Sequence, residues 1–218
     1  DRLLKEYKDF DQRCDVLRHN ALCKHHTKQF KASLILCELF LSDFKDSNYA
    51  AEVRFLEAEN HNYLGQFDKA ISAYEVLLKA HSKTVHHAHA QVQLGVLHYE
   101  LENYQAARAP LAQVWALEHH KYKPNAGYYL AWVDLSENKD QEAAKTFGEV
   151  SDNYPKHEVS ADARLQQGTI LHKSGQFAEA QKALENFIAT YVGDKRIDQA
   201  NYQLGLALME QKLWQPAL

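Results

Sequence analysis

The sequence contains few of the residues that favour loops and cross-links. Its 218 residues include 8 glycines, 4 prolines and 3 cysteines, a composition that argues against a loop-rich all-β protein. The cysteines, Cys14, Cys23 and Cys37, form no CxxC motif and are odd in number, so they indicate neither a disulfide framework nor a zinc site. We therefore expect small thiols that are buried or half-buried in a core.

Long apolar runs and an excess of positive charge are lacking as well. No apolar run approaches the roughly 20 residues that a membrane-spanning helix needs. The 25 Lys and Arg residues against 29 Asp and Glu residues give a net charge of −4, which does not support nucleic-acid binding. The 45% of hydrophobic residues is enough for a continuous core.

Sequence motifs for catalysis are also missing. We find no phosphate-binding loop, no nucleophile elbow, no paired-carboxylate pattern and no metalloprotease helix. The expectation is a protein that is not an enzyme, has no catalytic residues and needs no cofactor.

What the sequence does contain is a repeat. Small residues recur at intervals of 36 or 37 residues, first at Ala21, Ala58, Gly95, Ala131, Gly168 and Gly205, and again at Ser33, Ala70, Ala107, Ala143, Ala180 and Ala217. An aromatic residue precedes the second series at Phe30, Phe67, Tyr104, Phe177 and Trp214, with Asp140 as the exception. A period of this size indicates a stacked repeat architecture, in which each unit needs neighbours to cover its apolar face.

Each repeat has the pattern of two helices joined by a tight turn. Gly65 and Gly175 lie between the apolar patterns of the two helices and supply the backbone freedom of the turn. The small residues let the two helix axes approach to the short end of the usual 8–10 Å range, at about 8 Å.

This pattern resembles the tetratricopeptide repeat from residue 14 to residue 218. The best copy is Leu94-Gly95 followed by Tyr104, Ala107, Leu111 and Val114. The resemblance implies an all-α, right-handed superhelical solenoid of antiparallel helix pairs. The unit here is longer than the minimal repeat of about 34 residues. The longer link between repeats, as in Asp152-Asn153-Tyr154-Pro155, is similar to that of bacterial envelope-associated repeat proteins, which suggests the cell envelope or periplasm.

We predict first helices over residues 14–27, 49–64, 86–101, 124–137, 160–174 and 197–211, and second helices over 29–43, 67–81, 104–118, 140–153 and 177–191. Residues 1–218 are predicted to form a single domain, with repeats at about 14–50, 51–87, 88–123, 124–160 and 161–197. Residues 1–13 resemble the tail of a cut repeat and 198–218 a partial one, so neighbouring repeats of a longer array are expected partners. Pro110 predicts a kink, or a late helix start near residues 108–109.

The first helices of such a solenoid line its concave side, and one of their apolar stripes should form a groove there. Aromatic side chains in a concavity favour a protein or peptide site. The alternative is that the rings pack between neighbouring first helices. The predicted partner-binding residues are Phe55, Glu59, Asn62, Tyr63, Val92, Tyr99, Tyr128, Trp132, Leu135, His172 and Tyr202. Acidic residues on these faces do not support a clamp for a carboxylate, so an apolar or basic segment is the expected ligand.

The 13 histidines gather in the links between repeats and near the ends of first helices. His86 and His89 are three residues apart and could share one metal ion, but no further ligand completes the set. We therefore expect solvated or helix-capping histidines and no metal site.

The predicted function is a non-catalytic scaffold that binds a peptide or protein partner in a concave aromatic groove. The alternative is a structural or interaction module of a larger multidomain enzyme or of a bacterial envelope assembly protein. A third hypothesis, a metal-buffering surface, depends on the histidine count alone.

Overall fold

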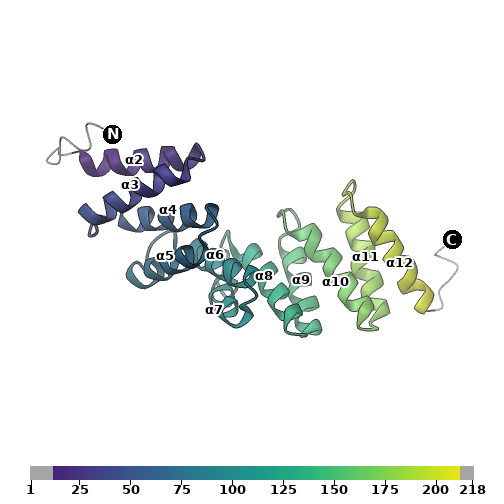
Figure 1. Cartoon of the computed structure of the whole chain (residues 1–218). Coiled ribbons are helices and arrows are strands. Elements are labelled where there is room, and N and C mark those ends of the chain that lie inside the picture. Colours follow the sequence, from purple (N-terminus) through teal and green to yellow (C-terminus); the bar gives the residue numbers. More distant parts are fainter. Residues whose placement is uncertain (1–11, 212–218) are drawn as a thin grey trace. The chain divides into compact units, whose positions relative to one another are not determined.

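The computed structural model describes residues 12–211, which form eleven α-helices (Figure 1). The first helices of the pairs are α2 (Arg13–His26), α4 (Ala50–Tyr63), α6 (His87–Glu100), α8 (Lys123–Ser136), α10 (Ser160–Lys173) and α12 (Ile197–Glu210). The second helices are α3 (Phe30–Asp43), α5 (Phe67–Ala80), α7 (Tyr104–Trp115), α9 (Asp140–Asn153) and α11 (Phe177–Thr190). The predicted all-α architecture of helix pairs is confirmed. The predicted tail before residue 12 and the helix predicted around Trp214 and Ala217 lie outside the described residues.

The helices divide between two compact units, residues 1–97 and residues 98–218, with the boundary inside α6. Each unit is described by itself below. Consecutive helices pack on each other from α2 to α5 in unit 1 and from α7 to α12 in unit 2, and the turn within a pair is three residues long.

A left-handed residue closes the turn of every pair. Gly65 and Gly175 have φ of 69° and 75°, as their type predicts. Lys28, Glu102 and Asn138 adopt φ between 58° and 60° at the equivalent positions without being glycine. The residue after each of them donates its N–H to a carbonyl five residues earlier, as Gln66 does to His61 at 2.9 Å, which is the Schellman helix end. The turn thus forms in repeats where no glycine marks it.

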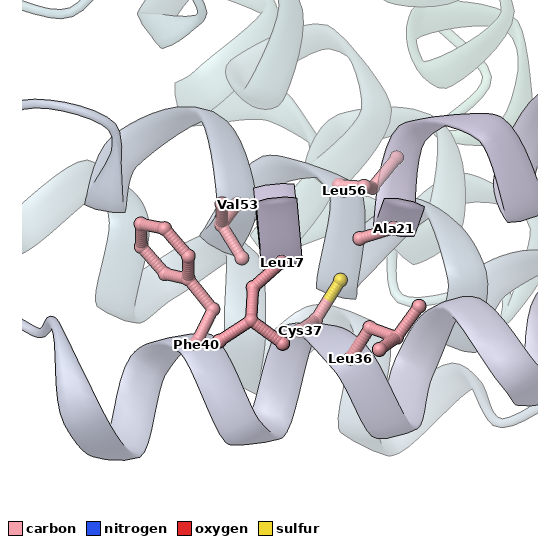
Figure 2. Close-up of a cluster of buried hydrophobic side chains, with 7 residues drawn as sticks. All are labelled: Leu17, Ala21, Leu36, Cys37, Phe40, Val53 and Leu56. Atoms are coloured by element: carbon pink, nitrogen blue, oxygen red, sulfur yellow. The ribbon is translucent and has the colours of Figure 1, made fainter. Parts of the chain in front are cut away.

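The core of one pair is completed by the next pair. In the cluster shown in Figure 2, Leu17 and Ala21 come from α2, Leu36, Cys37 and Phe40 from α3, and Val53 and Leu56 from α4. Burial raises the pKa of the Cys37 thiol to about 12, so it is an inert core residue. Cys14 is half-buried as expected, but Cys23 is exposed, because it lies on the outer side of α2.

Polar side chains join the same three helices. The Ser33 hydroxyl donates to the Ala21 carbonyl at 2.7 Å and accepts from the Asn60 amide at 2.9 Å. The amide oxygen of Asn60 lies 2.9 Å from Nδ1 of His25. Ser33 and Asn60 are fully buried, so this network satisfies polar groups that would otherwise destabilise the core.

The late helix start predicted near residues 108–109 is wrong. Helix α7 begins at Tyr104 and continues through Pro110 to Trp115. It has 12 residues, whereas the other helices have 14. Ala107, Leu111 and Val114 of α7 are fully buried, the first two in one core cluster, and this burial holds Pro110 within the helix despite its missing N–H. The kink at Pro110 stays a prediction.

Replacement by alanine is expected to change the free energy of unfolding in opposite directions at Gly127 and at Gly205. A Cβ on Gly127 would lie 2.5 Å from Cζ3 of Trp115 and 2.8 Å from Cγ2 of Val150, whereas a Cβ on Gly205 would have no atom of the described residues within 4 Å. We expect Gly127→Ala to lower the free energy of unfolding by about 1–3 kcal/mol through overpacking. Gly205→Ala should raise it by up to about 1 kcal/mol, because alanine favours the helix. Urea denaturation followed by circular dichroism measures both, and shifts of the same sign would contradict this account.

Candidate functional site

In unit 2, polar contacts join consecutive first helices. The Tyr128 hydroxyl of α8 donates to Oδ2 of Asp162 on α10 at 2.7 Å, and the Arg196 guanidinium before α12 bonds the other carboxylate oxygen, Oδ1. Further along, the Thr169 hydroxyl of α10 donates to Oε1 of Gln203 on α12 at 2.7 Å. These pairs are each 34 residues apart. We call the surface that α8, α10 and α12 form here the first-helix face.

Arg196 organises the charges of this face. Its Nη2 lies 2.8 Å from Oδ2 of Asp194, and its guanidinium lies 5.8 Å above the Phe187 ring. The hydrogen bonds from Arg196 lower the pKa of Asp194 to about 2, so this carboxylate is ionised at neutral pH. Burial and the Asp162 carboxylate raise the pKa of Tyr128, which therefore remains a hydrogen-bond donor. The network fixes the orientation of Tyr128 on the surface.

Aromatic rings gather around Tyr128. The ring of Tyr129 lies 5.4 Å from that of Tyr128 and 5.9 Å from that of Tyr99. Trp132 lies one turn along α8, with its ring 6.2 Å from Tyr128 and 5.5 Å from the fully buried Phe147. All four rings are half-buried. Each therefore presents one part to the core and another to solvent, an arrangement common at protein interfaces.

The other predicted residues of unit 2 are accessible to different degrees. Tyr202 on α12 is 69% exposed, while Leu135 and His172 are half-buried. The His172 ring packs edge-on against Phe177 at 5.5 Å. The structure thus brings Tyr99, Tyr128 and Trp132 into one aromatic cluster, whereas His172 packs against the turn of its own pair.

Unit 1 carries a second, smaller aromatic group. Tyr63 is 60% exposed and stacks on Phe30 with ring centroids 4.6 Å apart. Phe55 is half-buried, and its ring lies 5.0 Å from that of His86 and 4.8 Å from that of His89. Asn62 is half-buried on the same helix.

Two of the predicted residues present almost no surface. Val92 is 4% exposed, because α6 is buried over most of its circumference rather than along one stripe. Glu59 is 8% exposed and accepts a hydrogen bond from the Tyr74 hydroxyl, with the amide of Gln93 at 3.4 Å. Both belong to the packing between helix pairs and not to a surface groove.

Sequence reasoning missed Asp162, Arg196 and Tyr129. Asp162 and Arg196 form the network that holds the hydroxyl of Tyr128, and the ring of Tyr129 lies between those of Tyr99 and Tyr128. A search for complementary side chains 34 residues apart would have found the pairs, since Arg18 and Glu52 also bond at 2.7 Å with this spacing.

Several histidines of unit 1 are less solvated than expected, although His19 and His26 are exposed. His86 and His89 pack on Phe55, and Nδ1 of His61 lies 2.7 Å from Oε1 of Gln66. Over residues 12–211, no three His, Cys, Asp or Glu side chains are grouped so that they could hold a metal ion. Within the same range, no helix combines the length and the apolar character that crossing a bilayer requires.

Comparison with known proteins assigns the fold to a class. Residues 55–118 match the tetratricopeptide repeat family, in agreement with the helix pairs, so this part of the chain is built of tetratricopeptide-type repeats. More particularly, residues 120–215 match the family described as YfiO, outer membrane lipoprotein. A search of curated proteins finds no match.

Solved structures share the fold at low sequence identity. MamA is 22% identical, with a TM-score of 0.65 over 78% of this chain and 87% of its own. PilF of Pseudomonas aeruginosa is 15% identical, with a TM-score of 0.70 over 95% of this chain and 89% of its own. YrrB, described as a tetratricopeptide-repeat protein with an unusual peptide-binding site, is 18% identical, with a TM-score of 0.68 over 97% of this chain and 96% of its own.

The buried carboxyl of Glu59 should make the stability of the fold depend on pH. Burial raises its pKa above the ordinary value of 4.5, so the folded state favours the protonated carboxyl. Its contribution to stability is therefore fully present below pH 4.5 and is lost as the pH rises through the raised pKa. Gln at this position keeps the acceptor for Tyr74. We expect the free energy of unfolding of Glu59→Gln to increase relative to that of the parent as the pH rises above 4.5.

Urea denaturation at a series of pH values measures this difference. Glu75→Gln serves as the matched control, because Glu75 is exposed on α5. A constant difference between Glu59→Gln and the parent across the series would contradict the assignment of a desolvated carboxyl.

Proposed function

We propose that the chain is a non-catalytic protein-interaction scaffold that binds a peptide or a segment of a protein partner on the first-helix face of unit 2. The observation that carries the proposal is the aromatic cluster of Tyr99, Tyr128, Tyr129 and Trp132. Its rings are half-buried and are held by contacts with one another, with Phe147 and with Asp162. Rigid aromatic rings provide contact area at low entropic cost and are enriched among the residues that dominate binding. The peptide-binding site described for YrrB, which shares the fold, supports the same class of function.

The charges around the cluster favour a basic or apolar segment as the ligand. Burial is the main cause that raises the pKa of Tyr129, and the nearby carboxylates of Glu100 and Glu158 raise it further. Both glutamates are exposed. Asp162 is already neutralised by Arg196. A lysine or arginine of the partner would find both carboxylates and aromatic faces here, the two environments that attract a cation.

Trp132→Ala tests whether this surface binds the partner. The variant should weaken partner capture at least about tenfold, as expected for an aromatic anchor. It also removes packing against Phe147, so some stability will be lost. Phe147→Leu is the matched control, because it disturbs the same packing from the fully buried side and leaves the surface unchanged. Quantitative pull-down from an extract of the source cells, with circular dichroism of each variant, makes the measurement.

A partner that both folded variants retain equally would move the site away from this cluster. Equal loss in both variants would attribute the effect to stability and would likewise remove the support for Trp132 as an anchor.

A second candidate function is a module of a bacterial envelope assembly protein, because residues 120–215 match an outer membrane lipoprotein family. The same scaffold would then act at a membrane surface as part of a longer chain. Expression of the full-length gene product, followed by cell fractionation and labelling with a radioactive fatty acid, tests this candidate. We expect the labelled protein in the membrane fraction, and an unlabelled protein in the cytosol would exclude it.

A further inference from the structure

Unit 2 contains a groove on the side of α10 that faces away from the first-helix face. A cavity of about 710 Å³ lies between α9 and α11, with Arg164, Gln167 and Leu171 of α10 along it. At 100° per residue, Arg164 is about 200° around the helix from Asp162. The volume lies within the range of known ligand sites, about 300–1,000 Å³.

The walls of this groove carry matched charges. Glu142 of α9 and Glu179 of α11 are 37 residues apart and occupy equivalent positions of their repeats, and both line the cavity. Lys145 and Lys182 are equivalent in the same way and also line it. Since α9 and α11 run in the same direction, the groove has an acidic level and, three residues or about 4.5 Å further along the axes, a basic level.

Among the second helices that the structure describes, α9 and α11 alone carry Glu and Lys at these two positions. Glu142 and Lys145 also border a cavity of about 410 Å³ between α7 and α9. The equivalent positions of α7 hold Ala106 and Ala109, so the α7 wall of that neighbouring cavity lacks the Glu and Lys pair, and its charged residue, Arg108, already bonds Asp134 and Glu137. Lys145 makes an exposed contact of 3.8 Å with Glu149, whereas Glu142, Glu179 and Lys182 form no ion pair among the described residues. These charges are therefore available to a ligand.

The floor of the groove combines small residues with polar groups. Ala144 and Ala183 are 3% and 5% exposed, so the walls approach α10 without bulky side chains between them. Gly148 leaves room for the amide of Gln167, since a Cβ there would collide with it. Arg164 is 7% exposed, bonds Asp152 and donates to Oε1 of Gln167 at 2.7 Å, and its buried Nε has no hydrogen-bond partner within residues 12–211.

We propose that this groove is a second binding site, which takes an extended peptide segment with one basic and one acidic side chain two residues apart. Side chains at i and i+2 of an extended chain lie on one side and are about 6.6 Å apart, about 2 Å more than the spacing of the acidic and basic levels, a difference that flexible Glu and Lys side chains can span. The basic side chain lies between Glu142 and Glu179, and the acidic side chain between Lys145 and Lys182. Side-chain amides along the groove, at Gln141, Gln176 and Asn186, donate to and accept from the peptide main chain.

Four acetylated and amidated nine-residue peptides with the centres Lys-Ala-Glu, Lys-Ala-Lys, Glu-Ala-Glu and Gln-Ala-Gln, each flanked by Gly and Ser, test the proposal. Titration of the ¹⁵N-labelled chain followed by NMR measures weak binding and locates it. We expect the mixed peptide to bind about fivefold more tightly than the neutral one, with shifts centred on α9–α11. Glu142→Gln with Glu179→Gln should transfer the preference to Glu-Ala-Glu, and Lys145→Gln with Lys182→Gln should transfer it to Lys-Ala-Lys.

Matched controls change the net charge equally on second helices of unit 1. Glu38→Gln with Glu75→Gln, and Lys31→Gln with Lys69→Gln, alter exposed residues and should keep the preference for the mixed peptide. Trp132→Ala should keep it as well, so this test is independent of the function proposed for the first-helix face. A mixed peptide that binds no better than the neutral one, or a preference that the control variants also transfer, would overturn the proposal.

Discussion

Close contact between small residues is the constraint on which every helix pair of this chain depends. Ala21, Ala58 and Ala131 of the first helices are fully buried, as are Ser33, Ala70 and Ala143 of the second helices. The 2.7 Å hydrogen bond from the Ser33 hydroxyl to the Ala21 carbonyl shows how near the two backbones lie. Because the pairs are this close, their larger side chains extend toward the next pair, and the core of one repeat includes residues of the following one. Stacking, and with it the two surfaces considered as sites, follows from that contact.

The sequence was enough to predict the helices, because several residue types repeat with one period and mark both the contact positions and the turns. The predicted bounds agree with the structure within three residues at every described helix end. Helix α7 was the least well predicted, since the local effect of Pro110 is overridden by the burial of Ala107 and Leu111 on either side. Turns at Lys28, Glu102 and Asn138 have no glycine and could be located only through the period.

The candidate site was less accessible to prediction. A periodic stripe shows which residues share a side of a helix, but not whether a neighbouring helix covers that side, and Val92 and Glu59 are buried for this reason. Contacts such as Tyr128 with Asp162 depend on the offset between consecutive first helices, which the repeat length of 36 or 37 residues does not give. The groove between α9 and α11 is formed by three helices, so the sequence alone does not show that its charged residues face each other.

The most direct test of the account is site-specific photo-cross-linking of the partner. A benzophenone amino acid at Tyr202, which is 69% exposed on the first-helix face, is compared with the same group at Val76, which is 42% exposed on a second helix of unit 1. The account predicts a cross-linked partner from position 202, and loss of that product when Trp132→Ala is added. Cross-links from position 76 alone would contradict the claim that the partner binds the first-helix face.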